Sequence, residues 1–180
     1  MINLGFTAAA AVLVLHAQDN LALDEIGFGV LLASAAVGGV SGAQLAPRTI
    51  SRFGRRPSVL AAVAAAAAGV AMMGVADNLW TAAIGFAVFG FAGEIWNVVS
   101  VTYRQSVTPD DMLGRVMAGF RVIAYGAFPL GAVLGGLIAT TVGLRAAFFA
   151  GAGIIAALLL YLIPTTRHHS LDPELNPKTA

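Results

Sequence analysis

The sequence predicts an all-α, polytopic membrane protein with six transmembrane helices, arranged as two inverted three-helix repeats. The first observation is composition: 58% of the 180 residues are hydrophobic and only 11% are charged, whereas a soluble domain carries about 25% charged residues. The second is that uncharged runs reach the length that crosses a bilayer, roughly 20 residues. The third is that arginines gather in a few short connectors between these runs. The chain has no cysteine, which excludes disulfides and cysteine metal sites.

Six apolar stretches predict the spans in order along the chain. The first is short and lacks the basic leader of a signal peptide, so we interpret it as a helix whose start is cut away. Pro47 predicts the end of the second span, and Pro57 fits the first turn of the third. A proline and two acids at 109–111 predict the start of the fifth. The expected spans are about 2–17, 26–47, 57–76, 79–102, 115–140 and 143–164, within a domain of residues 1–166, and 167–180 is expected to be a flexible cytosolic tail.

The basic residues predict the orientation in the membrane. With six spans, connectors fall alternately on two sides, and lysine and arginine in short loops stay on the cytosolic side. We therefore expect the stretch 50–58 and the C-terminus in the cytosol, and the protein in the plasma (inner) membrane. One side carries Arg48, Arg52, Arg55, Arg56, Arg104, Arg115, Arg167 and Lys178, and the other carries Arg145 alone.

Small residues recur at four-residue spacing in the second and fifth predicted spans. The two series are Ser34, Gly38, Gly42, Ala46 and Ala127, Gly131, Gly135, Ala139, each member offset by 93 positions. Such a stripe lets helix backbones approach closely in lipid. Chance is the alternative, because the chain is rich in alanine and glycine. A real repeat would contain three spans, so its two copies would have opposite orientation, as in the halves of many transporters.

Several short motifs make the chain resemble the C-terminal half of a major facilitator superfamily transporter, and most closely the bacterial enterobactin-exporter and macrolide-efflux group. Two positions depart from the family pattern. Ser51 replaces the usual aspartate and Pro47 the usual glycine, which puts a strong gating salt bridge in doubt. The motifs are Arg52 with Gly54, Arg55 and Arg56; WNVVSV at 96–101; Arg104-Gln105; and Pro109 followed by Gly114-Arg115.

This resemblance implies half of a secondary active transporter, a proton-coupled exporter (an antiporter) of a small amphipathic compound, drug-like or siderophore-like, with a role in efflux and multidrug resistance. Full members have twelve spans in two halves. The implied partners are the lipid bilayer, the small-molecule substrate and an N-terminal six-helix half, in the same polypeptide or in a second subunit. No cofactor, metal or nucleic acid is expected. The alternative is a non-transporting membrane fragment or a helical subunit of another membrane protein. A membrane enzyme is disfavoured, because no catalytic motif or paired catalytic carboxylates appear.

Two charges inside the predicted spans, Glu94 and Arg121, are the main functional candidates. A charge at the membrane centre costs roughly 2.5–3.5 kcal/mol on insertion scales. We hypothesise that the two residues face each other or face a water-filled path, with Asn97 and Tyr125 on the same helix faces, and that Glu94 carries protons. A static ion pair or a snorkelling arginine is the alternative. The resemblance assigns cytosolic gating loops to Arg52, Gly54, Arg55, Arg56, Arg104, Asp111, Gly114 and Arg115, with Asp110 or Asp111 as possible pairing partners.

Overall fold

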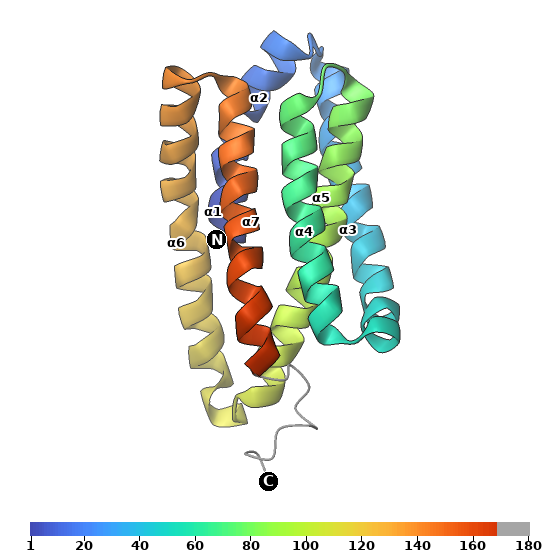
Figure 1. The fold of residues 1–180 in the computed structure, drawn as a ribbon, viewed down its shortest axis with the longest axis vertical. Helices are drawn as coiled ribbons and strands as arrows, with labels where there is room; N and C mark the ends of the chain where they lie inside the picture. The colour runs from blue at the N-terminus through green and yellow to red at the C-terminus, as the bar shows by residue number, and fades with distance from the viewer. Residues whose placement is uncertain (169–180) are drawn as a thin grey trace.

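The computed structural model describes residues 1–168 as an all-helical bundle without strands in that range (Figure 1). The long helices run up and down the bundle, and short connectors join them at its two ends. In chain order the elements are α1 (Ile2–Ala10), α2 (Leu13–Leu15), the π-helical turn η1 (His16–Asn20), α3 (Glu25–Phe53), α4 (Arg55–Val75), α5 (Leu79–Val107), α6 (Asp110–Thr141) and α7 (Leu144–His168). The predicted tail lies outside the described residues apart from 167 and 168, which belong to α7.

Five of these helices, α3 to α7, are long and apolar enough to cross a membrane. The first predicted span is not one continuous helix. Helix α1 ends at Ala10, and the backbone at Val12 leaves the helical region, with φ −110° and ψ 4°. After the short helix α2, the chain continues in a π-helical turn from His16 to Asn20. A sixth span over residues 2–17 therefore stays a prediction.

The long helices extend beyond the predicted spans at the arginine-rich end of the bundle. Pro47 does not end the second span, because it lies inside α3, which continues to Phe53. A proline removes one backbone hydrogen bond. Helix α3 has 29 residues and continues past Pro47 on its remaining backbone hydrogen bonds. The helix ends instead at Gly54, whose φ of +85° belongs to the left-handed region that favours glycine. Pro57 lies in the first turn of α4, as predicted.

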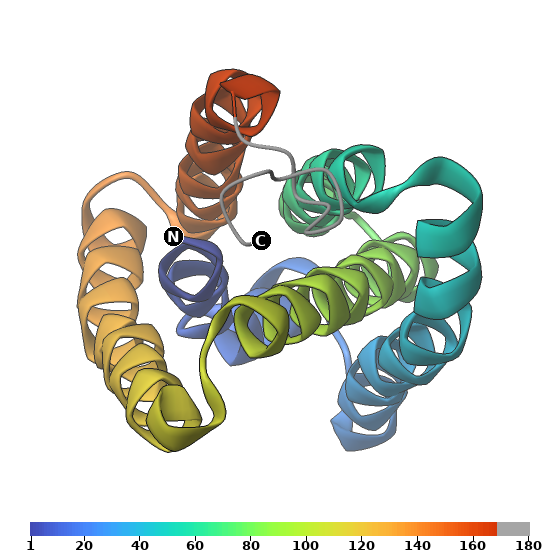
Figure 2. The same ribbon diagram turned by 90° about the horizontal axis from the view of Figure 1, so that it is seen from below.

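The arrangement of the helices places α1 and α5 in the middle of the bundle (Figure 2). Helix α3 packs along α5, and α6 packs along α1. Helices α4 and α7 pack against each other, and each also contacts one central helix, α5 and α1 respectively. The central helices meet through Phe6 and Phe89, whose rings stack with centroids 4.3 Å apart and planes 8° from parallel.

Glycines set the close approach of the flanking helices to the central ones. Gly38 and Gly42 of α3 are buried against α5, and a Cβ at either position would collide with the backbone carbonyl of Ala87 or Phe91. Gly131 and Gly135 of α6 are buried against α1 in the same way, against the carbonyls of Leu4 and Ala8. Ser34 and Ala127, the first members of the two predicted stripes, are only partly buried.

Helices α3 and α6 expose much of their apolar surface. Helix α6 buries only two residues, Gly131 and Gly135, although it has 32 residues. Val122 and Ile123 of α6 are among the most exposed hydrophobic residues in the described chain, and Val37 and Val40 are similarly exposed on α3. Helices α4, α5 and α7 bury a larger share of their spans than α3 and α6 do. Val63 and Val70 of α4 and Phe148 and Ile155 of α7 are fully buried in the core.

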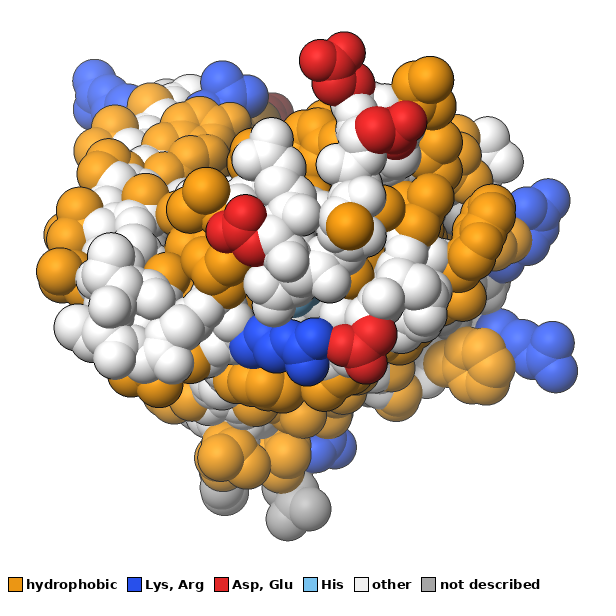
Figure 3. All heavy atoms as spheres, turned by 90° about the horizontal axis from the view of Figure 1, so that it is seen from above, with side chains coloured by type: hydrophobic (Ala, Val, Ile, Leu, Met, Phe, Trp, Pro, Cys, Tyr) orange, Lys and Arg blue, Asp and Glu red, His pale blue; other side chains and the backbone are white. Residues whose placement is uncertain are grey.

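The two ends of the bundle carry opposite charge. Acidic side chains gather at the upper end, which Figure 3 shows face on. The basic residue there, Arg145, forms an ion pair with Asp77. The upper connectors and helix starts supply Asp19, Asp24, Glu25 and Asp77. The arginine-rich helix ends form the lower end of Figure 1.

Candidate functional site

Glu94 and Asn97 form a polar pair within the apolar helix α5. They are three residues apart and therefore share one face of the helix. The Asn97 side-chain amide donates a hydrogen bond to a Glu94 carboxylate oxygen at 3.4 Å. Glu94 is half-buried, and its side chain reaches α3, where its Cγ would lie 3.6 Å from a Cβ built on Gly39. Asn97 is exposed. The pair thus stands at the boundary between α5 and α3.

Arg121 and Tyr125 lie one turn apart on α6 and are both exposed. They line an open groove along this helix, together with Leu113, Met117 and other residues of the same helix. The Tyr125 ring packs against Phe128 with a centroid distance of 5.5 Å. Within the described residues, no ion pair joins Arg121 to Glu94. The reason is the packing: α6 lies mainly on α1 and α7, whereas α5 lies on α3 and α4.

The predicted gating residues sit on helix ends rather than in loops. Arg52 belongs to the last turn of α3, Arg55 and Arg56 begin α4, and Gly54 alone joins the two helices. Asp111 lies in the first turn of α6, with Gly114 and Arg115 in the next turn. The connector was predicted to cover residues 48–56. In the structure it is Gly54 alone, because the polar residues on either side of Gly54 extend both helices.

Arg104 does not pair with Asp110 or Asp111. It lies in α5, where its Nη1 donates to the Ser100 hydroxyl at 2.6 Å. Its guanidinium carbon lies 3.6 Å from the centre of the Phe120 ring of α6. The Nε atom is buried without a hydrogen-bond partner, and among the described residues no carboxylate lies within ion-pair distance of this side chain.

His16, near the end of the first apolar stretch, is fully buried. Its Nε2 lies 3.1 Å from the Met73 carbonyl oxygen of α4, and its ring packs against Phe148 of α7 at 4.7 Å. The histidine therefore joins the broken first segment to the upper ends of two long helices. In the described range, no group of three or more potential metal ligands comes together, and His169 lies outside that range.

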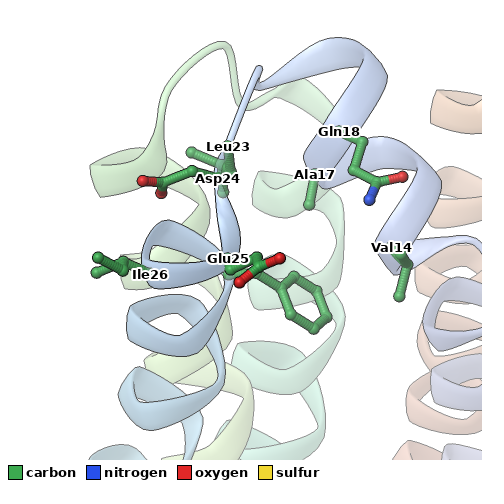
Figure 4. A pocket seen from close by; sticks show the side chains of 8 residues that line it. Val14, Ala17, Gln18, Leu23, Asp24, Glu25 and Ile26 are labelled. Atoms are coloured by element: carbon green, nitrogen blue, oxygen red, sulfur yellow. The ribbon is translucent and has the colours of Figure 1, made fainter.

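A hollow of about 580 Å³ at the acidic end was not predicted (Figure 4). It lies between the broken first segment, which contributes Val14, Ala17 and Gln18, and the start of α3, which contributes Glu25 and Ile26. Asp24 caps α3 by accepting a hydrogen bond from the Gly27 amide at 2.8 Å. The polar residues at 18–20 and 24–25 were the available signal, but the hollow depends on the break in the first segment.

Comparison with known proteins supports the class of protein that the helices define. The family model of the major facilitator superfamily matches residues 1–179. The chain belongs to the major facilitator superfamily, a family of membrane transporters, and is an integral membrane protein with long apolar helices. No curated protein matches the chain significantly. No solved structure matches it significantly.

Proposed function

We propose that this bundle is one half of a secondary active transporter that exports a small amphipathic compound in exchange for protons. Family membership supports the transporter class. The observation that carries the proposed coupling is Glu94, an acid with an amide neighbour on an otherwise uncharged stretch of a membrane-spanning helix. Substrate type and export direction follow from the resemblance to bacterial efflux proteins.

Glu94 has the properties of a proton carrier. In the described part of the chain, no cation forms an ion pair with it, and the Asn97 amide donates a hydrogen bond to its carboxyl group. A carboxyl group that moves between wet and dry surroundings releases its proton in the wet state and binds one in the dry state, because a low dielectric disfavours the charged form. Alternating access would move Glu94 between two such states.

The packing of the helices supports the proposal that two inverted three-helix units build the bundle. Gly38 and Gly42 correspond to Gly131 and Gly135 with an offset of 93, and their contacts on α5 and α1 correspond with an offset of 83. Phe6 and Phe89 are also 83 positions apart and stack on each other. A residue on a twofold axis must meet its own counterpart, so an axis would pass between these rings. The same axis would relate the helix contacts. The packing of α3 on α5 corresponds to that of α6 on α1, and the packing of α4 on α5 corresponds to that of α7 on α1.

The exposed apolar surfaces of α3 and α6 support the proposal of a second six-helix half. The proposed twofold axis relates these two helices, and both leave their outward faces uncovered. Within lipid such surfaces are not unfavourable in themselves, but the polar pair at the α3–α5 boundary and Arg121 on α6 would then also face the bilayer. A second half that covers them would enclose a polar path between the halves. We further propose that the arginine-rich end faces the cytosol.

Transport in membranes from source cells tests this proposal, with each substitution introduced into the cells' own copy of the gene. Amphipathic fluorescent dyes serve as probes, and their export is driven by an imposed proton gradient. Glu94→Gln keeps the size of the side chain but cannot ionise, so it should abolish gradient-driven export at normal protein level. Glu25→Gln is the matched control, because Glu25 is an exposed acid at the start of α3. Unchanged export by Glu94→Gln would contradict proton coupling through Glu94, and no dye movement in unmodified cells would favour a non-transporting membrane subunit.

A further inference from the structure

A pocket at the arginine-rich end of the bundle is separate from the proposed transport site. It has a volume of about 150 Å³ and lies between the first turns of α4 and the last turns of α7, with α5 as its floor. Val59 and Leu162 supply the two walls, and Trp96, Ser100, Tyr103 and Arg104 are among the α5 residues of the floor. By the 3.6-residue period, Trp96 and Tyr103 lie on the side of α5 opposite Glu94. A ligand in this pocket would therefore not occupy the polar site at the α3–α5 boundary.

The pocket combines an incompletely satisfied cation with apolar walls. One nitrogen of the Arg104 guanidinium donates to Ser100, and its π face rests on Phe120. Its Nε–H is buried with no acceptor, and the described residues supply no carboxylate partner. A half-buried arginine in this state favours an anion, and its planar donors match phosphate best. The surrounding residues favour hydrocarbon, because the walls are aliphatic and the floor carries two aromatic rings.

The height of the pocket along the bundle corresponds to the boundary between hydrocarbon and headgroups. Val59 is one helical turn from Arg55 and Arg56 at the start of α4. Arg104 lies in the last turn of α5. Tryptophan and tyrosine are typical of this level of a membrane, and basic residues here attract anionic lipids. A free phosphate ion would use the cation but not the apolar walls.

We propose that this pocket binds one anionic phospholipid, with its phosphate at Arg104 and an acyl chain between α4 and α7. The lipid phosphate would pair with the half-buried Arg104 side chain, and the bound lipid would brace α5 against α4 and α7 at this end. The proposal does not depend on what the protein transports or on whether Glu94 carries protons.

Tryptophan fluorescence in lipid bilayers of defined composition tests the proposal. The chain has two tryptophans, so Trp80→Phe leaves Trp96, which lines the pocket, as the single fluorophore. The full-length protein is placed in phosphatidylcholine bilayers that contain a small fraction of brominated phosphatidylglycerol or, in parallel, brominated phosphatidylcholine. We expect stronger quenching by the anionic lipid. Equal quenching by both lipids would overturn the proposal. This comparison needs only the Trp80→Phe protein and does not depend on the folding of other variants.

Substitutions show whether Arg104 causes the preference. Arg104→Gln should lower it about fivefold, the effect expected of one basic residue at an anionic surface. Arg115→Gln is the matched control, because Arg115 is an exposed arginine at the same end of the bundle, and it should leave the preference unchanged. A folded Arg104→Gln protein with the original preference would overturn the assignment.

Two further arms separate the lipid from other anions. Inorganic phosphate should not reduce quenching by the anionic lipid, and a loss of quenching would mean that the pocket takes phosphate instead. A chain shortened after His168 lacks Asp172 and Glu174. If the lipid preference appeared only in this shortened chain, residues 169–180, which contain these two acids, would be the natural occupant of the pocket, and the proposal would be wrong.

Discussion

The two central parts of the bundle, the first segment and α5, share their packing but differ in continuity and polarity. Each receives two glycines of a flanking helix on its backbone, α1 from α6 and α5 from α3. Helix α5 continues for 29 residues and carries Glu94 and Asn97. The position 83 residues before Glu94 is Ala11, where the first segment breaks. In the proposed repeat, the glycine contacts are common to both units, whereas the polar pair of Glu94 and Asn97 occurs in one unit only.

The largest expected effect comes from the glycines that the two central parts share. Gly38→Ala and Gly135→Ala each place a Cβ against a backbone carbonyl, of Ala87 and Ala8 respectively. Because backbone cannot move aside as a side chain can, each change should lower the free energy of unfolding by about 1–3 kcal/mol. Detergent-driven unfolding followed by circular dichroism measures it. Similar losses of unfolding free energy in Gly38→Ala and Gly135→Ala would support the proposed twofold symmetry.

Gly136→Ala is the matched control for these glycine substitutions, because a Cβ at Gly136 meets open space. It should leave stability unchanged or slightly higher, since alanine is the better helix former. A large loss in only one of Gly38→Ala and Gly135→Ala would break the comparison between the two central parts.

The next effect concerns His16, which distinguishes the broken first segment from α5. His16→Ala removes the contact with Phe148 and the hydrogen bond to the Met73 carbonyl. We expect a loss of about 1–2 kcal/mol in the free energy of unfolding, measured in the same way. Gln18→Ala, an exposed neighbour in the same π-helical turn, should have little effect. Equal stability of the His16 variant and the wild type would mean that this histidine does not anchor the segment.

The smallest effect is expected at the ion pair between Arg145 and Asp77, which lies at the same end as the break. Both side chains are substantially exposed, at 45% and 75%, and exposed ion pairs stabilise proteins by at most about 1 kcal/mol. A double-mutant cycle with Arg145→Gln and Asp77→Asn measures the coupling, which should shrink at high salt. A coupling larger than the loss in His16→Ala would show that this end is held by charge rather than by the buried histidine.

The all-helical membrane class and the five long helices could be predicted because apolar runs alone indicate membrane spans. Their ends could not, since polar residues such as Arg48 and Arg52 continue α3 past its apolar part. Pro47 was a misleading signal for the same reason. The break in the first segment has no local cause in the sequence, because neither glycine nor proline occurs from Ala10 to Leu13. It coincides with the burial of His16 against Met73 and Phe148, which are distant in the chain.

The candidate site was predictable only where it depends on local spacing. Glu94 and Asn97 are three residues apart, and helical geometry brings them together. We hypothesised that Glu94 and Arg121 face each other or a water-filled path, because both lie inside predicted spans, but which helices pack together is a tertiary property. The pocket at Arg104 was missed for the same reason, because α4, α5 and α7 all contribute to it. The proximity of Ser100, four residues before Arg104, was the available local signal.

The most direct test of whether this bundle works as one half of a transporter is the mass of the native particle. An antibody against residues 170–180 detects the protein in membranes of source cells, before and after chemical cross-linking. A band at about twice the 18.3 kDa of this chain, in a single polypeptide or after cross-linking, is the predicted result. A band that stays near 18.3 kDa under both conditions would mean that the exposed faces of α3 and α6 meet only lipid, and would contradict the proposed second half.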